Sequence, residues 1–61
     1  MRLTVICGLD HVPDECKAFE AARLLTELAE QIRTEGVKVG DMRVMNAPNA
    51  KRVGVSDITE H

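Results

Sequence analysis

Two cysteines and a histidine lie within ten residues near the start of the chain, in the segment CGLDHVPDEC at positions 7–16. Cys7, His11 and Cys16 carry side chains that can ligate a metal, form a disulfide or make a thiol–imidazole pair for nucleophilic catalysis. Their C-x3-H-x4-C spacing differs from zinc-finger patterns, in which the ligands come in close pairs. We therefore predict no metal and no cofactor, and these three residues are the candidate ligands should a metal be bound.

The expected local structure separates the two sulfur atoms. Cys7 falls on the inward face of an alternating strand, RLTVICGL at 2–9, whereas Cys16 lies outside the apolar stripe of the helix that follows. A disulfide needs Cα atoms within about 7 Å, so the geometry favours two free thiols. Cys16 near a helix N-terminus is the better nucleophile. However, no Asn or Asp is placed to orient His11, and a short chain leaves little room for a substrate cleft. We predict that the protein is not an enzyme.

One long amphipathic helix is predicted over about 13–35. Pro13 suits the first helical position, Asp14 and Glu15 favour the positive end of the helix dipole, and Gly36 is a typical terminator. At 100° per residue, the apolar stripe expected to face the sheet contains Ala18, Ala21, Ala22, Leu25, Leu28, Ala29 and Ile32, with Leu24 at its edge. The residues expected on the solvent side are Glu20, Arg23, Glu27, Glu30 and Gln31.

Two more strands are predicted after the helix. In the first, at 37–46, a bulge at 40–41 would bring Met42 and Val44 to the inward face with Val37 and Val39. The sequence APNA at 47–50 is typical of a turn, and a third strand at 51–58 would bury Val53 and Val55. The predicted fold is therefore a single α+β domain, 1–61, of β-α-β-β order. Its helix packs on one face of a small, mainly antiparallel three-stranded sheet whose last two strands form a hairpin.

The other face of this sheet has no helix over it. The residues predicted to lie there are Arg2, Thr4, Ile6, Lys38, Arg43, Met45, Arg52, Gly54 and Ser56. Antiparallel sheets can be solvated on one face, but two apolar side chains and four bases make this one both apolar and positive. The candidate binding residues on the sheet are Arg2, Ile6, Lys38, Arg43, Met45 and Arg52. A second candidate surface is the helix ridge with Phe19 and Arg23.

Size and charge restrict the function classes. The chain has 61 residues and one aromatic residue, Phe19, so its core is small, and chains of this size often need a partner subunit. The net charge of −2 is not that of a strongly basic protein. No apolar run reaches the ~18–20 residues needed to cross a bilayer, and no secretory signal is recognisable. We expect a cytoplasmic protein without a membrane partner, in which both thiols are reduced.

These observations favour a small non-enzymatic binding or regulatory protein that acts through protein–protein contacts as a homo-oligomer. An adaptor or inhibitor fits this class, as do the small proteins that phages and mobile elements encode. The alternative is a module that binds a nucleotide or nucleic acid through the basic sheet face. That alternative is disfavoured because the face has no stacking aromatic residue. A further alternative is a Cys/His protein that depends on a metal or on redox chemistry.

Overall fold

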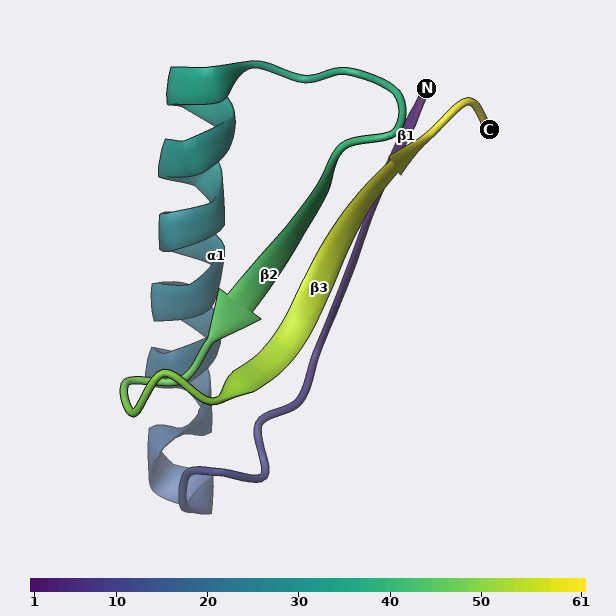
Figure 1. Ribbon diagram of the computed structural model, residues 1–61. Coiled ribbons are helices and arrows are strands. Elements are labelled where there is room, and N and C mark those ends of the chain that lie inside the picture. The colour runs from purple at the N-terminus through teal and green to yellow at the C-terminus, as the bar shows by residue number, and fades with distance from the viewer.

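The computed structural model describes residues 1–61 and contains one long helix and a three-stranded sheet (Figure 1). The elements are β1 (Arg2–Cys7), the 3₁₀ turn η1 (Asp14–Cys16), α1 (Lys17–Glu35), β2 (Met42–Asn46) and β3 (Arg52–Thr59). The sheet order is β1-β3-β2, and β3 pairs antiparallel with both neighbours. The predicted α+β fold, with one helix and an antiparallel three-stranded sheet, is confirmed.

The helical segment ends just before Gly36 as predicted, but it begins at Asp14, so Pro13 is the residue before the first turn and not its first helical residue. Pro13 is extended, with ψ at 162°, and the chain then forms one 3₁₀ turn before α1 begins. Gly36 has a φ of 84°, a left-handed conformation that glycine adopts without steric cost. Its N–H donates to the carbonyl of Ile32 at 2.8 Å, which satisfies one of the last carbonyls of the helix.

The buried side of α1 is rotated from the predicted stripe. Leu24 and Leu28 are buried, but Leu25 is 49 % exposed. The small residues Ala18, Ala22 and Ala29, which were expected to face the sheet, are also exposed. Glu20, expected on the solvent side, is 4 % exposed. The rotation arises because Leu24 and Leu28 pack on Met45 of β2, while Glu20 is satisfied by His11 of the preceding loop and by Arg23 of the helix.

The two faces of β2 are inverted relative to the prediction. Met45 is 5 % exposed and packs against Leu24 and Leu28, whereas Met42 is 68 % and Val44 49 % exposed. The register irregularity lies between Met45 and Asn46. Without the predicted shift before Met42, that residue and Val44 turn away from the helix.

The same parity applies to β3, where Ser56 pairs with Arg43 and Gly54 pairs with Met45. Ser56 is 1 % exposed, and the two pairs share the helix side of the sheet. The prediction that Arg43, Met45, Gly54 and Ser56 lie on the uncovered face is therefore wrong. The prediction that Val55 is directed at the helix is also wrong, because Val55 pairs with Val44 on the other side.

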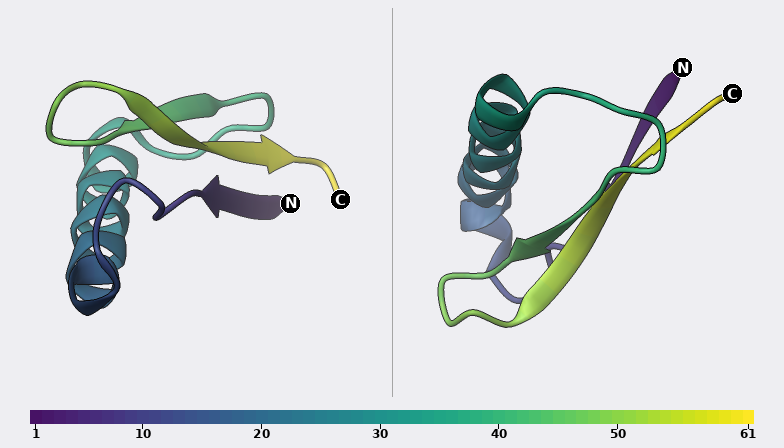
Figure 2. Two further views of the ribbon diagram at one scale, coloured as in Figure 1. Left: turned by 90° about the horizontal axis from the view of Figure 1, so that it is seen from below. Right: turned by 45° about the horizontal axis from the view of Figure 1, so that its top comes forward.

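The helix and the sheet converge at one end and diverge at the other. Figure 1 and the right-hand view of Figure 2 show them close together near the loop between β2 and β3, and apart at the C-terminal end of α1. The main core cluster lies on the converging side: Leu24, Leu28 and Met45, with Val5, Cys7, Leu9, Ile32 and Val53 packed against them. Ile58, which is 2 % exposed, is buried near the other end of β3. Only 7 of the 61 residues are buried, so few side chains of the protein belong to its core. The helix is not apolar enough to span a lipid bilayer.

Candidate interaction surface

The side of the sheet away from α1 carries a continuous apolar row. Ile6 pairs with Val55 and Val55 pairs with Val44, so these three side chains lie next to one another across β1, β3 and β2. Ile6 is 67 % exposed on β1, Met42 and Val44 are exposed on β2, and Val55 lies half-buried between the two strands. We call this side of the sheet the open face; its residues are Arg2, Thr4, Ile6, Met42, Val44, Asn46, Arg52, Val55, Asp57 and Thr59.

Opposite charges lie on β3 on either side of the apolar row. Asp57 pairs with Met42, and Arg52 pairs with Asn46, so each lies two positions of β2 from Val44. Arg52 reaches this position because the register shift leaves Val53 without a partner on β2, and Val53 packs against the core. Neither charge forms an ion pair within the chain.

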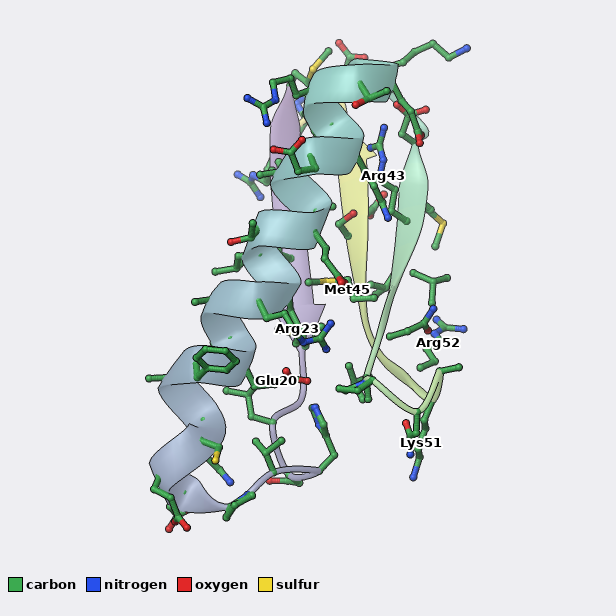
Figure 3. All side chains as sticks on the ribbon, turned by 90° about the vertical axis from the view of Figure 1, so that its left-hand side faces the viewer. Glu20, Arg23, Arg43, Met45, Lys51 and Arg52 are labelled. Carbon is green, nitrogen blue, oxygen red and sulfur yellow. The ribbon has the colours of Figure 1, made fainter.

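The four predicted basic residues do not gather on one surface. Arg43 lies between the helix and β2, whereas Arg52 lies beyond β2 (Figure 3). Arg2 pairs with Thr59 at the opposite end of β3 from Arg52, and Lys38 belongs to the loop before β2. Of the six candidate binding residues predicted on the sheet, the structure therefore places Arg2, Ile6 and Arg52 on the open face.

Arg43 instead lies beneath the C-terminal end of α1. Its Nη2 donates to the carbonyl of Gly36 at 3.0 Å and lies 3.6 Å from the carboxylate of Glu35 and 4.0 Å from that of Asp41. A cation is favourable at the negative end of the helix dipole, which explains why a charged residue faces inward here. The Nε and Nη1 atoms of this side chain are buried without a hydrogen-bond partner.

A cluster of three ionisable residues lies at the converging end of the helix and sheet. The Glu20 carboxylate is 2.5 Å from His11 Nε2 and accepts hydrogen bonds from Arg23 Nε at 2.7 Å and Nη2 at 2.8 Å. Arg23 Nη2 also donates to the carbonyl of Asn46 at 3.1 Å. The cluster thus ties the β1–α1 loop and the end of β2 to the helix, and Figure 3 shows Glu20 and Arg23 together at this end.

The charges and hydrogen bonds of this cluster favour the ionised form of Glu20. The hydrogen bonds from Arg23 and then from His11 lower the pKa of Glu20 from 4.5 to about 2. The carboxylate in turn raises the pKa of Arg23. Sequence reasoning missed this cluster. The i, i+3 spacing of Glu20 and Arg23 was a usable signal for their pairing, but nothing in the local sequence indicates that His11 joins them.

The three candidate ligands of the first segment are not brought together. Both cysteines are free thiols, with Cys7 half-buried against the core and Cys16 exposed at the start of α1. His11 is held by Glu20. No group of three or more Cys, His, Asp or Glu side chains has the arrangement of a metal site.

The predicted helix ridge is present only in part. Phe19 is 77 % exposed and lines a shallow hollow with Ala22, Thr26 and Glu27. Arg23 borders the same hollow, but its guanidinium is turned toward Glu20 and is hydrogen-bonded there.

The open face is therefore an extended apolar surface that the fold leaves uncovered. It combines a row across all three strands with unpaired charges on both sides of that row. Comparison of the chain with protein-family models, with curated proteins and with solved structures finds no match.

Proposed function

We propose that this is a non-enzymatic binding protein that acts through protein–protein contacts, and that the open face is its binding surface. The observation that carries the proposal is the apolar row Ile6–Val55–Val44, in which Ile6 and Val44 are exposed and Val55 is half-buried, with exposed Met42 beside Val55 and Val44. Exposed apolar patches rimmed by polar residues are typical of interaction sites. Here Thr4, Asp57 and Arg52 supply the polar rim.

The surroundings of the nucleophile candidates support a binding role rather than a catalytic one. Cys16 has no hydrogen-bonded base, and His11 is paired with a carboxylate from a different element. General-base activation of a nucleophile requires the two groups within hydrogen-bond reach of each other.

The alternative of an anion-binding module stays a prediction, and it has less support in the structure than in the sequence. Arg43 is turned toward the helix and paired with groups of the chain itself. Arg52 begins β3, Arg2 of β1 pairs with Thr59 at the other end of β3, and Asp57 lies between the two ends. The open face therefore presents mixed charge and offers no concentrated basic site for phosphate groups.

The test is affinity purification from the cells that produce the protein, followed by mass spectrometry. Wild type is compared with Val44→Lys on the open face and with Leu25→Lys on the exposed side of the helix. Both positions are 49 % exposed, so the two substitutions are matched. We expect proteins that are captured by wild type and Leu25→Lys but lost with Val44→Lys. The same set of proteins with all three baits would refute the role of the open face.

A further inference from the structure

We propose that the occupant of the open face is a second copy of this chain, packed back to back in a two-fold symmetric dimer. This inference rests on the proposed function, because it identifies the partner that the same surface binds.

The first argument is the surface area of the isolated chain. Its accessible surface is 4407 Å² for a mass of 6.7 kDa. A compact monomer of this mass exposes about 3,900 Å², so the chain carries an excess of about 500 Å². The radius of gyration is 12.1 Å, against about 10.5 Å expected for 61 residues. The excess is similar to the area that one partner contributes to a small stable interface, about 600–800 Å².

The second argument is the symmetry of charge on the central strand. Asp57 and Arg52 pair with Met42 and Asn46 of β2, which lie two residues before and two residues after Val44. Each charge is therefore about 7 Å from the apolar row, on opposite sides of it. A two-fold axis along the row, perpendicular to the strands, reverses the strand direction of the second copy. It therefore places Asp57 of one copy opposite Arg52 of the other, and does so twice.

The same operation pairs the apolar residues with themselves. Ile6, Val55 and Val44 lie on the axis, so each faces its counterpart in the other copy. Stacked sheets pack about 10 Å apart with their strands within about 30° of one another, a spacing that these side chains can fill. Both the apolar row and the charges are thus self-complementary.

The experiment measures association by sedimentation equilibrium with two opposite charge reversals. Arg52→Asp leaves two acids on β3, and Asp57→Arg leaves two bases. We expect each variant alone to weaken dimerisation about tenfold or more, since it places like charges opposite each other. An equimolar mixture of the two variants should associate with about the affinity of wild type, because the opposite charges then meet across the interface.

A third variant, Val55→Asp, places a carboxylate on the axis against its own copy and should abolish the dimer. Far-UV circular dichroism of each variant confirms that the monomer is folded. A wild-type dimer that is insensitive to all three substitutions would overturn the proposed arrangement, because another surface would then hold the copies together. A wild type that is monomeric at about 100 µM would also overturn it, since physiological dimers of this size bind more tightly. If partner capture is still lost with Val44→Lys in that case, the binding function stands and only self-association fails.

Discussion

Gly54 occupies a place in β3 where the structure leaves no room for a side chain. A Cβ added there would lie 2.5 Å from Cys7 Cβ, 2.6 Å from the carbonyl oxygen of Ile6 and 2.8 Å from Cys7 Cα. Two of these atoms are backbone, so rotation of a side chain cannot relieve the contact. To reach an ordinary contact of 3.4 Å, β1 must withdraw from β3 by about 0.9 Å. Such a shift lengthens the ladder hydrogen bonds beyond their usual limit of about 3.2 Å.

We therefore expect Gly54→Ala to destabilise the fold by about 1–3 kcal/mol or more, the usual cost of an overpacked interior. A chain of this size has about 3–5 kcal/mol in total, so the loss is a large fraction of its stability. With a urea m-value of about 1 kcal/mol/M, the unfolding midpoint should fall by about 1–3 M. The chain has no Trp or Tyr, so unfolding is followed by far-UV circular dichroism at a fixed protein concentration.

Gly8→Ala is the matched control. Its added Cβ would meet only the carbonyl oxygen of Val53, at 3.8 Å, which is ordinary contact. Neither glycine has a left-handed backbone, so backbone strain does not distinguish the two substitutions, whereas the space available does. We expect the midpoint of Gly8→Ala to remain within a few tenths of 1 M of wild type. If Gly54→Ala is as stable as Gly8→Ala, the close approach of β1 and β3 at this point is refuted.

Three further predictions concern stability. Leu24→Ala should lower the free energy of unfolding by about 2–5 kcal/mol, because Leu24 is 1 % exposed. Leu25→Ala, at a position 49 % exposed, should lower it by less than about 1 kcal/mol. Urea titration of the two variants tests the difference. The pKa of Glu20 is lowered from 4.5 to about 2, so the stability it contributes is present above pH 4.5 and is lost as the pH falls toward 2. Urea titrations across that range should show this decline in wild type and a shallower one in Glu20→Gln. Ala50 has a φ of 69°, a backbone conformation that strains alanine but not glycine, so Ala50→Gly should raise the thermal unfolding midpoint. Ala47→Gly, at a position 6 % exposed and without a positive φ, should lower that midpoint.

The features predicted from the sequence are those set by local chemistry. Pro13 and Gly36 act through their own backbone preferences, and they mark the ends of the helical segment to within one residue. The alternation of β1 was also readable: Val5 and Cys7 pack toward the core while Ile6 is exposed. Its inward positions carry apolar side chains, and Arg2 and Thr4 share the other face.

The features that could not be predicted depend on contacts between distant segments. In MRVMN, apolar residues occupy both parities, so the pattern alone does not decide which face of β2 is buried. The choice is made at the helix end, where the Gly36 carbonyl accepts a hydrogen bond from Arg43 and Glu35 pairs with its charge, and by the packing of Met45 against Leu24 and Leu28. The same holds for Glu20, whose burial requires His11 from the preceding loop.

The strand order has a consequence for how the protein folds during its synthesis. β1 pairs only with β3, so it has no partner in the sheet until residues 52–59 have left the ribosome. At about 5–20 residues per second, the nascent β1 stays unpaired for about 3–10 s. Its sequence RLTVIC has a single charge, at Arg2, and no proline, so it carries few of the usual protections against pairing with other chains. The nascent N-terminal segment is thus the part of the chain most exposed to misassembly, and α1 can form in the meantime because its hydrogen bonds are local.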